Sequence, residues 1–177
     1  MIIMGIDPGL ATTGYGVISF SHRGAGKSHQ KIDTPFKCLV YGTIKTSPLN
    51  SSPERLNKLY NELTKLTQQY RPAVMAVENI YFFKNLKTAL PVSQAKGVIL
   101  LAAAKKKIPV LEITPLQVKI ALAGHGRAEK SQVQQVVKII LSLNEVPRPD
   151  DVADALAIAI CCAGRMKEKT LPKVKFK

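Results

Sequence analysis

Three strand-like segments open this chain with no helix between them, and this order constrains the fold more than any other feature of the sequence. Apolar and β-branched residues predict strands over residues 2–7, 15–20 and 38–45. Strands joined without an intervening helix are most simply antiparallel hairpins. Residues 21–34 are polar, basic and contain glycine, which is typical of a long hairpin loop.

Further along the chain, strands alternate with helices. Leucines from Leu56 to Leu66 recur at helical spacing and predict a helix that ends at Arg71-Pro72. Residues 73–77 form a continuous apolar run, which is the pattern of a strand buried on both faces. The other predicted elements are a helix over 86–107, a strand over 109–113, and helices over 116–122, 130–142 and 151–166. Because strands that alternate with helices are usually parallel, we expect an α/β fold with a mixed five-stranded sheet flanked by helices on both faces.

The length and the charge indicate one domain that meets a polyanion. The 177 residues suffice for a single domain with a real core, which we place at 1–166, followed by a basic, flexible tail over 167–177. Lys and Arg outnumber Asp and Glu by 26 to 12, a formal charge of +14. A domain this basic most often binds nucleic acid.

Two classes of protein are disfavoured by the same composition. No apolar stretch is long enough to span a bilayer, so we expect no membrane partner. The three cysteines, Cys38, Cys161 and Cys162, are odd in number and fit neither a disulfide framework nor a zinc site. They are typical of core residues in a reducing compartment, and we expect the protein in the cytoplasm.

Against this basic background, four carboxylates fall at the ends of predicted elements. Asp7 closes the first strand and Glu78 the fourth, while Asp151 and Asp154 lie in the first turn of the last helix. If the first and fourth strands are neighbours, about 4.8 Å apart, Asp7 and Glu78 can share a metal ion. Mg²⁺ prefers oxygen ligands, and paired ions stabilise the attacking and leaving oxygens of a phosphodiester. The pattern favours a metal-dependent nuclease.

Simpler structural roles also account for some of these acids. Asp150, Asp151 and Asp154 suit the N-terminal turn of a helix, where the helix dipole favours negative charge. Asp7 opens an Asp-Pro-Gly turn. Glu78 has the weakest structural explanation, because a carboxylate that closes a buried strand needs a partner.

Four motifs follow one another along the chain in a particular order. They are Gly5-Ile6-Asp7-Pro8-Gly9 with Thr13-Gly14-Tyr15-Gly16; Ala76-Val77-Glu78; Gln117-Val118-Lys119 with Ala128-Glu129-Lys130-Ser131-Gln132-Val133; and Asp151-Val152-Ala153-Asp154-Ala155-Leu156-Ala157-Ile158-Ala159. In this order and spacing they resemble the RuvC family of bacterial Holliday junction resolvases, over residues 1–165.

The resemblance implies a fold, an activity and partners. The fold is RNase H-like, with the first and fourth strands adjoining. The activity is that of an endodeoxyribonuclease that resolves four-way junction DNA by paired nicks in homologous recombination and DNA repair. Two Mg²⁺ ions per active site are implied as cofactors, with Mn²⁺ as a substitute. The implied partners are a second copy of the chain, in a homodimer, and the RuvAB branch-migration complex.

The resemblance also assigns roles to particular residues. It implies a catalytic, metal-binding set of Asp7, Glu78, Asp151 and Asp154, supported by the basic residues Lys119 and Lys130. It implies DNA contacts by Tyr81, Phe82, Lys84, Lys119, Arg127 and Lys130. An aromatic side chain in this region is expected to stack on an unpaired base near the crossover. We favour Tyr81 for this contact and Phe83 for the core; for Phe82, stacking and core packing stay open.

Two departures from the family pattern and three alternative functions complete the sequence argument. The loop over 21–34 is longer than usual, and Pro91 inside the helix over 86–106 predicts a kink or a restart of that helix. A YqgF-like relative acting on RNA, an ATP-binding domain of the actin and sugar-kinase type, and a non-catalytic nucleic-acid-binding protein are the alternatives. The second needs two such domains, and the third leaves the carboxylates without a purpose.

Overall fold

Strands and helices follow one another in the order that the sequence predicts. The computed structural model describes residues 1–21, 35–79 and 86–168. The elements in these ranges are β1 (Ile2–Asp7), β2 (Thr12–Phe20), β3 (Phe36–Lys45), α1 (Ser52–Tyr70), β4 (Val74–Glu78), α2 (Leu86–Lys105), β5 (Val110–Ile113), α3 (Pro115–Ala123), α4 (Lys130–Ile140) and α5 (Asp150–Glu168).

The strands form one mixed sheet with the order β3-β2-β1-β4-β5. The two pairs formed early in the chain, β1 with β2 and β2 with β3, are antiparallel, whereas β1 with β4 and β4 with β5 are parallel. This confirms the predicted sheet. Ile6 lies opposite Val77 in the β1–β4 ladder, so Asp7 and Glu78, the last residues of these two strands, lie side by side.

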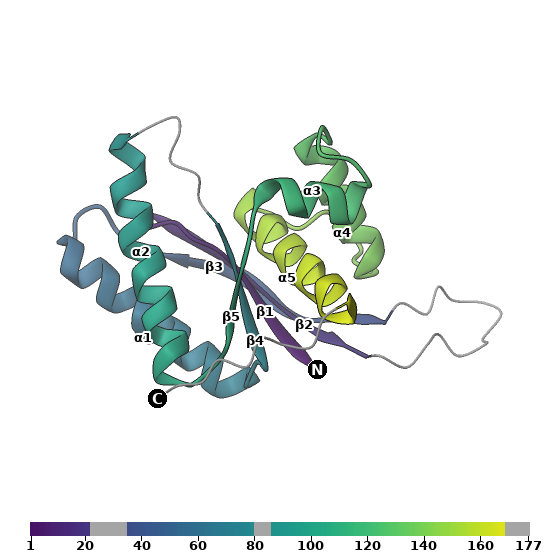
Figure 1. Cartoon of the computed structure of the whole chain (residues 1–177). Helices are drawn as coiled ribbons and strands as arrows, with labels where there is room; N and C mark the ends of the chain where they lie inside the picture. Colours follow the sequence, from purple (N-terminus) through teal and green to yellow (C-terminus); the bar gives the residue numbers. More distant parts are fainter. Residues whose placement is uncertain (22–34, 80–85, 169–177) are drawn as a thin grey trace.

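Helices cover both faces of the sheet, as Figure 1 shows: α1 and α2 lie on one side, and α3, α4 and α5 on the other. Each side has its own apolar core. The core between the sheet and the α1–α2 layer contains Leu59 and Leu63 of α1 and Ile99 of α2. The core on the other side contains Leu156 of α5. Helix α5 is buried almost without interruption from Val152 to Ala163, so it forms the centre of its layer.

Glycines let α5 lie directly against β1 and β2. Gly5 and Gly16 face each other across the β1–β2 ladder. A Cβ atom added to Gly5 would clash with the carbonyl oxygen of Ala155, and one added to Gly14 would clash with that of Asp151. The helix backbone therefore contacts the strand backbone, which brings the acidic first turn of α5 to the ends of β1 and β2.

We expect Gly14→Ala to destabilise the protein, because the added methyl group has no space between β2 and α5. Overpacking of this kind costs about 1–3 kcal/mol of unfolding free energy. Gly164→Ala is the matched control. Gly164 lies in α5 with nothing within 4 Å of an added Cβ, and because Ala favours a helix over Gly by about 1 kcal/mol, this variant should not lose stability. Urea denaturation of both variants measures the effect. If Gly14→Ala were as stable as the wild type, the close approach of α5 to β2 would not be needed for stability.

Pro91 and the element ends differ from the sequence expectations. Helix α2 continues from Leu86 to Lys105 with Pro91 inside it, so the expected restart at Pro91 is wrong. Pro91 lies in the second turn, where its missing N–H removes one backbone hydrogen bond and the neighbouring bonds maintain the helix. Helix α5 runs over Asp150–Glu168, slightly beyond the predicted 151–166 at both ends. The predicted loop over 21–34 lies, apart from its first residue, outside the described residues, as do residues 169–177 of the predicted tail.

Candidate active site

Three elements bring the predicted carboxylates to one place. The carboxyl ends of β1 and β4 carry Asp7 and Glu78, whose side chains share a hydrogen bond. Helix α5 adds Asp151 from its first turn and Asp154 just beyond that turn, and both lie near enough to affect the ionisation of Asp7. The structure thus unites the four acids that the sequence places at element ends. The neighbouring position of β1 and β4, on which that prediction depended, is confirmed.

The carboxylates have unusual ionisation because they are buried and close together. Burial, followed by the charges of Glu78, Asp154 and Asp151, raises the pKa of Asp7 to about 8. Burial and then Asp154 raise the pKa of Glu78, against the lowering effect of its hydrogen bond to Asp7 and of Lys130 and Lys96. Burial also raises the pKa of Asp154. Such a cluster stores electrostatic repulsion that a bound cation would relieve.

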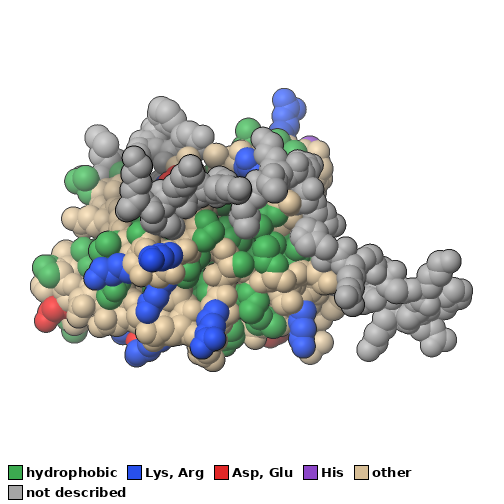
Figure 2. All heavy atoms as spheres, turned by 60° about the horizontal axis from the view of Figure 1, so that its bottom comes forward, with side chains coloured by type: hydrophobic (Ala, Val, Ile, Leu, Met, Phe, Trp, Pro, Cys, Tyr) green, Lys and Arg blue, Asp and Glu red, His purple; other side chains and the backbone are tan. Residues whose placement is uncertain are grey.

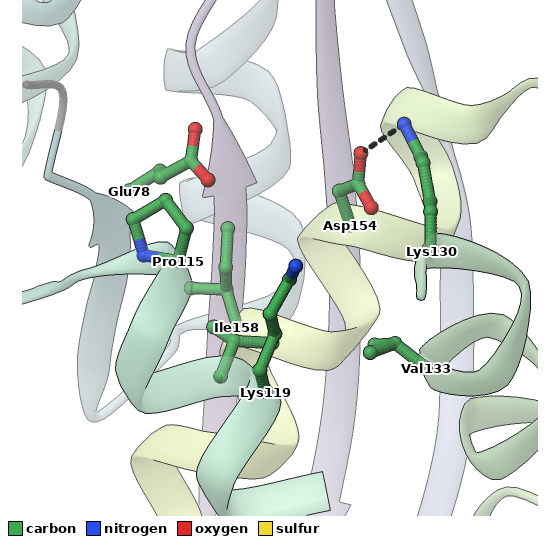
Figure 3. A pocket seen from close by; sticks show the side chains of 8 residues that line it. Glu78, Pro115, Lys119, Lys130, Val133, Asp154 and Ile158 are labelled. Atoms are coloured by element: carbon green, nitrogen blue, oxygen red, sulfur yellow. Dashed lines mark ion pairs between the residues drawn. The ribbon is translucent and has the colours of Figure 1, made fainter. Parts of the chain in front are cut away.

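Lys130 sits beside this cluster. Its Nζ lies 2.8 Å from Asp154 Oδ2 and 3.4 Å from Asp150 Oδ2, and the shorter pair is the dashed line in Figure 3. Burial disfavours the charged ammonium, but the contacts with Asp154 and Asp150 outweigh it and raise the pKa of Lys130. Lys130 therefore stays positive and faces the carboxylates.

A cavity of about 280 Å³ opens next to these groups. It lies between α3, α4 and α5, and its lining is Glu78, Pro115, Val118, Lys119, Lys130, Val133, Asp154 and Ile158. In Figure 3 the Lys119 side chain extends from α3 toward the rim that carries Glu78 and Asp154. The cavity thus combines an apolar floor with two acids and two lysines, which is an arrangement suited to an anionic group held near cations.

The remaining predicted site residues have different outcomes. Asp151 lies at the edge of the cluster, with its backbone packed against Gly14 of β2. Arg127 is exposed in the loop between α3 and α4. Tyr81, Phe82, Phe83 and Lys84 lie outside the described residues, so their predicted contacts with DNA or with the core stay predictions.

The donor set fits a hard divalent cation. Carboxylate oxygens are the ligands that Mg²⁺ and Mn²⁺ prefer, and burial together with neighbouring acids raises the pKa values of Asp7 and Glu78, an effect that a bound cation would oppose. Within residues 1–21, 35–79 and 86–168, no three His, Cys, Asp or Glu side chains are already arranged to hold a metal ion. The metal role of the four acids therefore stays a prediction.

We expect Asp7→Asn to stabilise the metal-free protein. Between the ordinary pKa of Asp7, near 3.8, and its folded value of about 8, the unfolded chain has lost a proton that the folded chain keeps. Unfolding then releases a proton, so the stability of the wild type falls as pH rises through this window. Asn has no ionisable carboxyl group. Asp7→Asn should therefore raise the free energy of unfolding by about 0.5–2 kcal/mol near the upper end of the window and by little near the lower end.

Thermal melts in EDTA across this window test the expectation. Glu62→Gln is the control, because Glu62 lies on α1 and forms an ion pair with Lys65 instead of joining the cluster. Addition of Mn²⁺ should raise the melting temperature of the wild type, because it binds the folded form, and should raise that of Asp7→Asn much less. A melting temperature of Asp7→Asn below that of the wild type at the upper end of the window would contradict the expectation.

Sequence reasoning missed the groups that surround these acids. Asp150 accepts hydrogen bonds from Gln134 Nε2 at 3.1 Å and from Arg148 at 2.8 Å, and these, with Lys130, hold the pKa of Asp150 low. Gln134 is a buried polar residue on the otherwise apolar face of α4, which is a weak signal that the sequence does contain. Lys96 of α2, which also affects Glu78, follows the apolar stripe of its helix and has no such signal.

Comparison with known proteins places this geometry in a family. The model of the family described as "Crossover junction endodeoxyribonuclease RuvC" matches residues 3–162. The chain belongs to the RuvC family. A relative of that description from Alkaliphilus metalliredigens is 47% identical over 99% of this chain and 100% of its own length. Another, from Pelotomaculum thermopropionicum, is 53% identical over 92% of this chain and 93% of its own length.

Solved structures agree with this assignment. The RuvC structure from Thermus thermophilus has a TM-score of 0.83 and 38% identity, covering 94% of this chain and 97% of its own. The RuvC of the same organism in complex with a Holliday junction substrate has a TM-score of 0.82 and 35% identity, covering 96% of this chain and 98% of its own. The RNase H-like fold and the resemblance seen in the sequence are thereby confirmed.

Proposed function

We propose that this protein is a Holliday junction resolvase, which cuts four-way DNA junctions by paired nicks in recombination and repair. One observation supports it above all: the RuvC family match covers residues 3–162 and therefore includes the whole carboxylate cluster at β1, β4 and α5. The RuvC from Thermus thermophilus, similar along almost the whole chain, has been solved with a Holliday junction substrate.

The proposed cofactor is Mg²⁺, with two ions per site and Mn²⁺ as a substitute. Asp7 and Glu78, adjacent at the ends of β1 and β4, would hold one ion, and Asp154 and Asp151 of α5 would complete the set. When bound, divalent ions lower the pKa of a water molecule and stabilise the developing charge on the phosphate.

The lysines of the site have a separate proposed role. Lys130 is held positive beside Asp154, and Lys119 extends toward the same rim. Both would contact the phosphate group and offset the negative charge that increases as the phosphodiester is attacked. The apolar floor of the cavity would exclude water from the side of α3 and α4, which strengthens these interactions.

DNA binding is proposed to depend on the basic residues spread over the chain. The formal charge of +14 attracts phosphates along a whole duplex arm. On the face seen in Figure 2, Lys and Arg side chains recur between apolar and neutral groups, whereas acidic ones are few. Arg127, exposed between α3 and α4, is proposed to add a further phosphate contact.

Partners and location follow from the same proposal. A homodimer would place two active sites across one junction, and Leu90 and Leu101 of α2, 71% and 51% exposed, leave apolar surface for a second copy. The RuvAB branch-migration complex is the proposed partner on DNA, in the cytoplasm. Across the described part of the chain, no helix is both long and apolar enough to cross a bilayer.

One experiment tests the proposed function against the alternatives. The purified protein is incubated with Mg²⁺ and, separately, with a labelled four-way junction, a duplex, a structured RNA and ATP. We expect paired nicks in strands of like polarity on the junction alone. Cleavage of RNA in preference to the junction, hydrolysis of ATP, or binding of DNA without any cleavage would each replace the proposal with a different function.

A further inference from the structure

A lysine of α2 reaches the carboxyl ends of β4 and β5. Lys96 Nζ lies 2.7 Å from Glu112 Oε2 on β5 and donates a 3.2 Å hydrogen bond to Asn79 Oδ1. Asn79 directly follows Glu78, so this contact is one residue from the candidate active site. It connects the helix layer of α1 and α2 with the strand ends that carry the acids.

The burial of Lys96 distinguishes this contact from an ordinary surface pair. The Lys96 side chain is only 15% exposed, whereas Lys65, which makes a bond of the same 2.7 Å to Glu62, is 70% exposed. An exposed pair contributes little to stability. A lysine withdrawn from water instead depends on its partners, because an unpaired buried ammonium is strongly unfavourable. The geometry of the strand ends and the position of Lys96 are therefore linked.

Asn79 is fixed from two sides. Its backbone N–H donates a 2.8 Å hydrogen bond to the carbonyl of Ile113, and its side chain accepts the bond from Lys96. Glu78 itself is paired with Ile113 in the β4–β5 ladder. The backbone just after the Glu78 carboxylate is thus held by β5 on one side and by α2 on the other.

We infer that Lys96 is a positioning residue, which fixes Asn79 and through it the Glu78 carboxylate in the place where a divalent cation binds. The inference rests on the proposed function for the nature of that cation. A positioning role and a purely electrostatic role of Lys96 predict opposite effects on metal binding. A positive charge near a cation site repels the cation, so electrostatics predicts that removing Lys96 tightens metal binding. Positioning predicts that removing Lys96 weakens it.

The test measures binding of Mn²⁺ alone to the full chain by titration calorimetry. Lys96→Met keeps the length of the side chain and removes the bonds, and we expect its Kd for Mn²⁺ to rise about 10-fold or more, as for other changes that release a metal ligand from its support. Lys96→Arg, which can still donate to Asn79 and Glu112, should restore most of the affinity. Lys65→Met is the matched control, with the Kd of the wild type.

Asn79→Ala is a second variant, which retains the pair between Lys96 and Glu112 and should also weaken Mn²⁺ binding. A purely structural role would lower the melting temperature of Lys96→Met and leave the Kd unchanged. An unchanged or tighter Kd in Lys96→Met, or a wild type that binds no Mn²⁺, overturns the inference. If the wild type binds Mn²⁺ but leaves a four-way junction intact, the proposed function fails while the Mn²⁺ titrations still decide the role of Lys96.

Discussion

Asp7→Asn, Glu78→Gln, Asp151→Asn and Asp154→Asn are each expected to abolish junction cleavage without abolishing junction binding. An amide oxygen carries no full charge and holds a divalent cation poorly. We expect the cleavage rate to fall by about 10³-fold or more, which corresponds to ~4 kcal/mol in the barrier. Binding depends on the basic surface, and removing an acid near phosphate should leave it equal or slightly tighter.

Nicking and gel-shift assays on the same preparations separate the two effects. Glu62→Gln, which removes one acidic charge from α1, is the control and should cleave as the wild type does. The melting temperatures of all variants are compared, since Asp7→Asn is expected to be more stable than the wild type without metal. Any variant that cleaves at the full rate excludes its residue from the catalytic set.

The second large effect concerns the shape of the substrate. Contacts with phosphates alone would bind any duplex, and a protein that contacts about 6–10 phosphates loses roughly 10³–10⁵-fold in affinity between about 50 and 200 mM salt. A resolvase must in addition recognise the branch. We expect a four-way junction to bind roughly 10³-fold more tightly than a linear duplex of equal length, at the low end of specific over non-specific DNA binding.

Competition between a labelled junction and unlabelled duplex, at several salt concentrations, measures both the salt dependence of DNA binding and the preference for the junction. The affinity for each DNA should fall steeply with salt, because the +14 charge acts on both. The ratio of the two affinities should persist, because in the proposed homodimer it depends on the geometry of the two sites. Equal affinity for the two DNAs would argue against junction recognition, and so would a protein that sedimentation shows to be monomeric with and without the junction.

Local patterns in the sequence predict the order of elements and the place of the four acids well. Strand and helix periodicities are local, and the apolar run over 73–77 already indicates a strand buried on both faces. The step from Asp7 and Glu78 at strand ends to a shared site required only that β1 and β4 be neighbours, which the topology confirms. The RuvC resemblance agrees with each of these predictions.

Features that depend on how separate elements pack together could not be predicted from local sequence patterns. The partners of Lys96 are Asn79, directly after β4, and Glu112 of β5, and only the packing of α2 against the strand ends brings them within reach. The expected restart of the helix at Pro91 was wrong, because neighbouring bonds outweigh one lost hydrogen bond. The close contact of Gly14 with α5 likewise involves residues more than 130 positions apart.

Helix α5 serves as the centre of a core layer and also carries two of the four acids. We expect the buried part of this helix to exchange its amide hydrogens mainly through global unfolding. Asp151 and Asp154 are then expected to form a fixed wall of the site. We therefore expect adaptation to a substrate to come from outside α5. Amide exchange should accordingly be slowest in α5, and binding of a junction should change protection at α2 more than at α5.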